Sequence, residues 1–140
     1  MEGNISTVLI VGNDDSLRAF LRMLLEQGGG FDFCIEASGG TEAIDKARRL
    51  SPHLAILDCS LPEMNGLQLA QQLWEIMPRL PIFMLTADRN IQVEKEALSF
   101  GINAVFSKLG DLGTLPANAR AVCGIERDGH LRDFPHRNTE

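Results

Sequence analysis

Residues 54–66 read LAILDCSLPEMNG, and this segment indicates the fold most clearly. Its first four residues are apolar, which is typical of a strand that is buried on both faces of a parallel sheet. Asp58 follows this run, and a turn containing Pro62 and Gly66 comes next. A buried strand that ends on a carboxylate predicts a functional position at the carboxyl edge of an α/β sheet.

The rest of the chain alternates similar runs with amphipathic stretches. Three further apolar runs predict buried strands at 7–11, 82–85 and 104–107. An alternating pattern over 31–37 predicts a half-buried strand. Apolar residues three and four positions apart predict helices, the first starting near Asp14–Ser16 and ending at Gly28–Gly30, and the others at 41–50, 67–77, 91–100 and 115–123. Strands alternating with helices predict an α/β fold, a parallel five-stranded sheet with helices on both faces.

Length and composition restrict the class of protein. The 140 residues, 44% hydrophobic, suffice for one domain, which we expect over 1–123, with a polar tail or linker over 124–140. No apolar run exceeds four residues, so we expect no signal peptide and no membrane-spanning segment. The net charge is −6 and the basic residues are scattered, which disfavours direct nucleic-acid binding. Three dispersed cysteines suggest buried thiols, and we expect a soluble cytoplasmic protein.

Three polar residues follow strands whose carboxyl ends share one edge of the predicted sheet. They are Asp58, Thr86 and Lys108. A carboxylate, a hydroxyl and an ammonium group together predict a site for a phosphoryl group. Asp58 is the candidate nucleophile, Lys108 offsets negative charge, and Thr86 donates a hydrogen bond to a phosphoryl oxygen. We expect Mg²⁺ as a cofactor, because phosphoryl transfer depends on positioning and charge neutralisation.

These motifs resemble those of the receiver domain of two-component response regulators. The resemblance covers about Thr7 to Cys123 and rests on residues 57–66, 85–87 and 106–108, in the family's order. It implies a flavodoxin-like, doubly wound sheet in the order 2-1-3-4-5. It also implies phosphoryl transfer from a kinase phosphohistidine to Asp58, with the backbone carbonyl of Ser60 as a metal ligand.

The resemblance also implies partners. These are a sensor histidine kinase or phosphotransfer protein and a downstream target protein. The family's fourth helix, fifth strand and fifth helix often form a face for partners or for a homodimer.

The chain departs from the family pattern at the metal-binding positions after the first strand. The family places two acidic residues there, where this chain has Gly12 and Asn13. In one interpretation Asn13 supplies a neutral oxygen and Asp14 turns inward as a substitute ligand. In the other, Asp14 and Asp15 only cap the helix that follows.

Two further departures concern the last strand. Val105 stands where the family usually has an aromatic residue, and Phe106 is expected to face the opposite side of the sheet. Leu109 replaces the proline that usually follows the lysine, so we expect a trans peptide bond between Lys108 and Leu109 and a displaced loop after it.

Three hypotheses remain open from the sequence. The first is a switch that catalyses its own phosphorylation and dephosphorylation at Asp58. The second is an atypical receiver that acts through protein contacts without phosphorylation, which Gly12, Asn13, Val105 and Leu109 favour. The third is an unrelated flavodoxin-like enzyme or flavin binder, which the acidic Asp14 and Asp15 disfavour, because a phosphate-binding loop needs backbone amides and hydroxyl groups.

Overall fold

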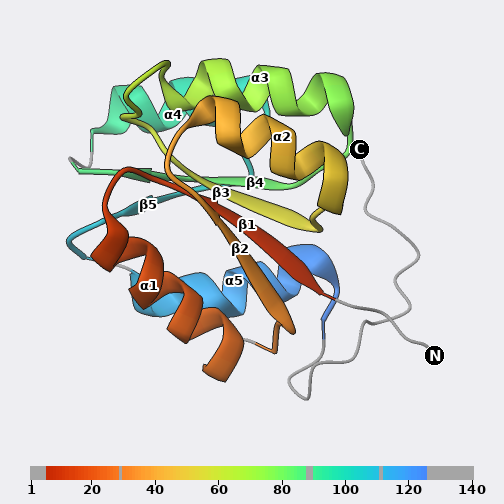
Figure 1. Cartoon of the computed structure of the whole chain (residues 1–140). Helices are drawn as coiled ribbons and strands as arrows, with labels where there is room; N and C mark the ends of the chain where they lie inside the picture. Colours follow the sequence, from red (N-terminus) through yellow and green to blue (C-terminus); the bar gives the residue numbers. More distant parts are fainter. Residues whose placement is uncertain (1–5, 29, 88–89, 111, 126–140) are drawn as a thin grey trace.

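The computed structural model describes residues 6–28, 30–87, 90–110 and 112–125. Five parallel strands form one sheet in the order β2-β1-β3-β4-β5 (Figure 1). Both the predicted parallel sheet and the predicted order are therefore confirmed. The strands are β1 (Thr7–Val11), β2 (Phe33–Ala37), β3 (Leu54–Asp58), β4 (Ile82–Thr86) and β5 (Ala104–Ser107).

Helices cover both faces of the sheet. Helices α2, α3 and α4 lie on one face, and α1 and α5 lie on the other (Figure 1). Their limits are α1 (Asp15–Met23), α2 (Gly40–Leu50), α3 (Gly66–Ile76), α4 (Ile91–Phe100) and α5 (Leu115–Cys123). A π-helical turn (Leu24–Gly28) extends α1, and a 3₁₀ turn (Leu112–Thr114) precedes α5. Helices α4 and α5 have the predicted limits.

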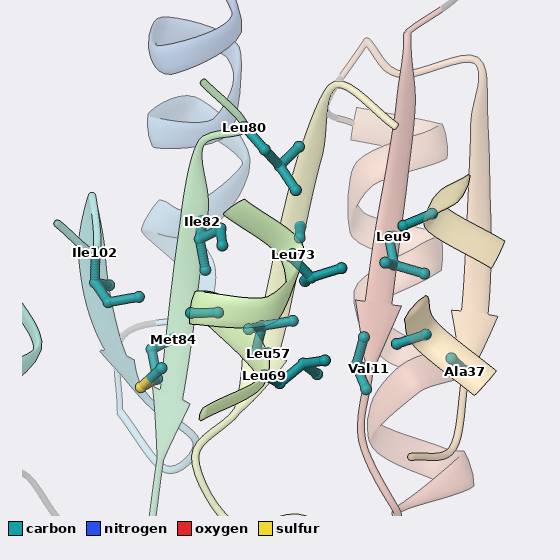
Figure 2. Close-up of a cluster of buried hydrophobic side chains, with 14 of the residues drawn as sticks. Leu9, Val11, Ala37, Leu57, Leu69, Leu73, Leu80, Ile82, Met84 and Ile102 are labelled. Carbon is teal, nitrogen blue, oxygen red and sulfur yellow. The ribbon is translucent and has the colours of Figure 1, made fainter. Parts of the chain in front are cut away.

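Each face of the sheet has its own hydrophobic cluster. The first packs β1, β3 and β4 against α2 and α3, with Leu9, Leu57 and Leu73 among its buried residues (Figure 2). The second packs the opposite side chains of the same strands against α1 and α5. Burial on both faces explains why β1, β3 and β4 are continuous apolar runs. Val105 belongs to the first cluster and Phe106 to the second, which confirms that they face opposite sides.

Some predicted core positions were wrong. The helical spacing of Phe20, Leu21 and Leu25 predicts that all three are buried; Leu21 and Leu25 are, but Phe20 is 43% exposed. The alternation over 31–37 predicts that Phe33 is buried, and the helical spacing over 41–50 predicts the same of Leu50, but both are exposed. Both lie where an element begins or ends, at the start of β2 and at the end of α2. The periodic pattern identifies the buried side of an element, but it does not indicate where the covering element stops.

The cysteine prediction was correct for one residue of three. Cys34 is buried, whereas Cys59 and Cys123 are partly exposed. Burial and the nearby Glu26 carboxylate raise the pKa of the Cys34 thiol to about 12. Cys34 is therefore protonated at neutral pH.

The predicted tail, 124–140, falls mostly outside the described residues, since 126–140 are not among them. Gly124 and Ile125 are described. Ile125 is 2% exposed and packs in the cluster beneath α1 and α5. Within the described part of the chain, no helix has both the length and the apolar character that are needed to cross a membrane.

Candidate functional site

Strand register brings the three predicted site residues to the same edge of the sheet. Asp58 ends β3 and pairs with Leu85 of β4, so Thr86 lies one residue farther along β4. Thr86 in turn pairs with Ser107 of β5, and Lys108 follows directly. The residues therefore come from three neighbouring strand ends, as the sequence predicted.

Asp58 is a buried carboxylate with a partner on each oxygen. Its side chain contacts the ammonium group of Lys108, with 2.6 Å between Nζ and Oδ2. The backbone N–H of Ser60 donates a hydrogen bond to Oδ1 at 3.0 Å. Asp58 is 3% exposed, and among the described residues it is the only acidic residue that is buried. A charge removed from water needs such partners, so the ion pair and the amide hydrogen bond together hold Asp58 in place.

The backbone of β4 fixes the position of Lys108. The N–H of Lys108 donates to the carbonyl oxygen of Thr86 at 2.9 Å, which continues the ladder between β4 and β5 by one residue. Thr86 itself is buried. The ladder therefore holds the main chain of the lysine close to Asp58, and the side chain reaches the carboxylate from there.

The hydroxyl group of Ser107 stabilises the start of the loop after Lys108. The Ser107 Oγ accepts a hydrogen bond from the N–H of Leu109 at 3.1 Å. The described residues contain no cis peptide bond, so the Lys108–Leu109 bond is trans, as expected. Leu109 is 86% exposed.

Gly12 lies beside Asp58, and the two residues that follow it bring no carboxylate to Asp58. A small cavity at this edge is lined by Gly12, Asp14, Arg18 and Asp58, together with apolar residues of β1, α1 and β4. Asn13 and Asp14 are exposed. The Oδ1 atom of Asp14 accepts hydrogen bonds from the N–H groups of Ser16 and Leu17, so this carboxylate caps α1.

Arg18 is a site residue that the sequence analysis did not identify as one. Its Nη1 donates to the carbonyl oxygen of Gly12, its Nη2 contacts Asp15, and its Nε donates to Glu36 at 3.0 Å. Burial alone would lower the pKa of Arg18, but the hydrogen bonds and charges of Glu36 and Asp15 raise it above its ordinary value. The guanidinium group therefore stays charged beside the cavity. The sequence places Arg18 on the first turn of α1, but it carries no signal for the contact with Gly12, which depends on how the side chain folds back.

The donor groups at this edge do not fit a strong magnesium site. Mg²⁺ prefers hard oxygen ligands, usually including one or two carboxylates. Within the described ranges, no group of three or more His, Cys, Asp and Glu side chains could hold a metal ion. The buried carboxylate, Asp58, is already paired with a cation. Metal coordination by Asp58, Asn13, Asp14 and the Ser60 carbonyl oxygen therefore stays a prediction.

The sequence is similar to proteins of one known family. Residues 8–120 match the model of the response regulator receiver domain family. The chemotaxis protein CheY of Thermotoga maritima is 34% identical over 97 residues, covering 67% of this chain and 78% of that protein. The transcriptional regulatory protein CreB of Escherichia coli is 34% identical over 122 residues, covering 86% of this chain and 49% of CreB.

A solved structure shares the fold. A chain of the CheX–CheY–BeF₃–Mg²⁺ complex from Borrelia burgdorferi superposes with a TM-score of 0.76 at 23% identity, covering 84% of this chain and 88% of that one. At this identity the likeness shows the fold alone. Several relatives are much longer than this chain, which spans 56%, 29% and 7% of the length of three curated proteins that it matches.

Proposed function

This chain belongs to the response regulator receiver domain family, and from this premise we propose that Asp58 accepts a phosphoryl group from a phosphohistidine. The donor would be a sensor histidine kinase or a phosphotransfer protein. The observation that carries the proposal is the buried Asp58 carboxylate, 2.6 Å from the Lys108 ammonium group at the carboxyl edge of the sheet.

The chemistry of the site supports this role. In the transfer, a carboxylate oxygen of Asp58 forms a bond to phosphorus. The bond from phosphorus to the imidazole nitrogen of the donor breaks, and that nitrogen keeps the electron pair. The acyl phosphate carries more negative charge than the carboxylate that it replaces. Lys108 would offset that charge, and the hydroxyl of Thr86, on the neighbouring strand end, would donate a hydrogen bond to a phosphoryl oxygen.

Intact-mass measurement after incubation with acetyl phosphate and Mg²⁺ tests the proposal. We expect wild type to gain one phosphoryl group and Asp58→Asn to gain none. Asp58→Asn is a matched control because it keeps the shape of the side chain and removes the nucleophilic charge. Wild type that stays folded by circular dichroism but gains no mass would overturn the proposal. A gain that persists in Asp58→Asn would place the acceptor elsewhere.

A second candidate is a receiver that acts through protein contacts without phosphorylation. Helix α4 carries exposed apolar side chains, and Ile91 is 70% exposed. Leu98, which is also exposed, lies seven residues later and therefore on the same side of the helix. A downstream protein or a second copy of the chain would cover this side. Light scattering of wild type and Ile91→Asp, without any phosphoryl donor, tests the second copy. A monomer of unchanged mass in both would leave a different protein as the partner.

A further inference from the structure

Nothing in the backbone or in the packing requires glycine at position 12. Its φ lies outside the left-handed region that favours glycine. A Cβ built on Gly12 would lie 3.8 Å from both Cβ and Oδ2 of Asp58, which is ordinary van der Waals contact. A Cβ at this position would therefore lie next to the Asp58 carboxylate without a close contact.

Lys108 already balances the charge of Asp58, with 2.6 Å between its Nζ and the Asp58 Oδ2. Asp14 and Arg18 also line the cavity beside Gly12. The Asp14 carboxylate is engaged elsewhere, because it accepts hydrogen bonds from N–H groups at the start of α1. Arg18 donates to the carbonyl oxygen of Gly12 and is paired with Asp15 and Glu36. A divalent cation entering here meets one buried carboxylate that is already paired with a cation, so it gains little net attraction.

We propose that Gly12 leaves the Asp58 pocket one carboxylate short of a divalent-metal site, and that Lys108 rather than a tightly bound Mg²⁺ balances Asp58. The inference rests on the proposed function only in taking Asp58 as the reacting group. It assigns Gly12 as the residue that determines metal affinity. One substitution tests this, because a Cβ at position 12 meets no close contact and would direct a carboxylate toward Asp58.

Titration with Mn²⁺, followed by the electron paramagnetic resonance signal of the free ion, tests the inference without any phosphoryl donor. The variants are Gly12→Asp and its neutral isostere Gly12→Asn. We expect Gly12→Asp to bind Mn²⁺ about 10- to 100-fold more tightly than Gly12→Asn. Wild type should bind as weakly as Gly12→Asn. Adding Asp58→Asn to Gly12→Asp should remove the gain, because the new site needs both carboxylates.

Two outcomes would overturn the inference. The first is wild type binding Mn²⁺ as tightly as Gly12→Asp, since Asn13 or Asp14 would then already complete the site. The second is a folded Gly12→Asp that binds no better than Gly12→Asn. If Gly12→Asp fails to fold, Gly12→Glu supplies the carboxylate at the same position on a longer side chain, and an affinity no higher than that of Gly12→Gln also counts against the inference.

The result stays separate from the phosphorylation assay. Tight Mn²⁺ binding by wild type together with a phosphoryl gain on Asp58 would overturn this inference and leave the proposed function standing. A gain in metal affinity in Gly12→Asp together with no phosphorylation of wild type would support this inference and overturn the proposed function.

Discussion

At the scale of single residues, Gly66 and Gly12 both lie next to Asp58 but under opposite constraints. A Cβ on Gly66 would lie 2.8 Å from the carbonyl oxygen of Asp58 and 2.9 Å from the Cα of Cys59. Both are backbone atoms and cannot rotate away. At Gly12 the nearest atoms are 3.8 Å away. Glycine at position 66 therefore allows a close backbone approach, whereas glycine at position 12 leaves space unused.

The contrast predicts different costs for the same substitution. Gly66→Ala should lower the free energy of unfolding by about 1–3 kcal/mol, as overpacking does. An alanine in a helix is otherwise favoured over glycine by roughly 0.5–1 kcal/mol. A loss of stability in Gly66→Ala would therefore indicate the close contacts rather than helix propensity. Gly12→Ala, the control, should change the free energy by less than about 1 kcal/mol. Urea unfolding measures both, and equal losses in the two variants would contradict the interpretation.

The sequence predicted the site residues that follow strands, but it did not predict those that come from helices. Asp58, Thr86 and Lys108 could be identified because a parallel sheet aligns the ends of its strands. Arg18 could not, because its role depends on the direction in which a long side chain folds back from α1 to the carbonyl oxygen of Gly12. The capping role of Asp14 was one of two interpretations that the sequence left open.

At the scale of elements, side chains cover the free edge of β2. This strand is the first in the sheet order, so one of its edges has no neighbouring strand. The N–H of Cys34 donates to Glu26 at 3.0 Å, and the carbonyl oxygen of Glu36 accepts from the ammonium group of Lys46 at 2.7 Å. An edge whose backbone groups are occupied by charged side chains resists pairing with another chain.

Removing both side chains should expose that edge. We expect the double variant Glu26→Ala, Lys46→Ala to associate as its concentration rises, because a free donor and a free acceptor then lie two residues apart on an extended strand. Multi-angle light scattering over a concentration series measures the mass. Asp45→Ala, Arg49→Ala is the matched control, since it removes an exposed ion pair of α2 and leaves the edge covered. A double variant that remains monomeric throughout would show that Glu26 and Lys46 are not needed to keep the edge of β2 from pairing with another chain.

Helix caps show which element boundaries the sequence can indicate. Helix α3 begins with a local capping box between Asn65 and Gln68, so its start is encoded within four residues. Helix α2 has Gly39 at its cap position and no side-chain cap of its own. The carboxylate of Glu63, from the loop after β3, instead accepts a hydrogen bond from the N–H of Thr41 at 3.1 Å. A cap that comes from 22 residues away cannot be predicted from local sequence.

At the scale of the whole molecule, the fold was predictable because two signals agreed. Continuous apolar runs required cover on both faces of the sheet, and the intervening amphipathic stretches supplied that cover. The strand order came from the family resemblance, since periodicity alone does not specify which strands are neighbours. The C-terminal limit of the folded part was the least certain feature, because one buried residue beyond a helix leaves no periodic pattern.

Ile125 lies two residues beyond Cys123, where the sequence predicts that the domain ends. It is 2% exposed, and its N–H donates to the carbonyl oxygen of Arg120 at 2.8 Å. We propose that the folded unit includes it. Ile125→Ala in the full chain should then lower the free energy of unfolding by about 2–4 kcal/mol, because it removes buried methyl groups from the cluster beneath α1 and α5. A chain ending at residue 123 should lose at least as much relative to one ending at 125. Urea unfolding of the two pairs of chains tests the proposal, and equal midpoints within both pairs would return the boundary to Cys123.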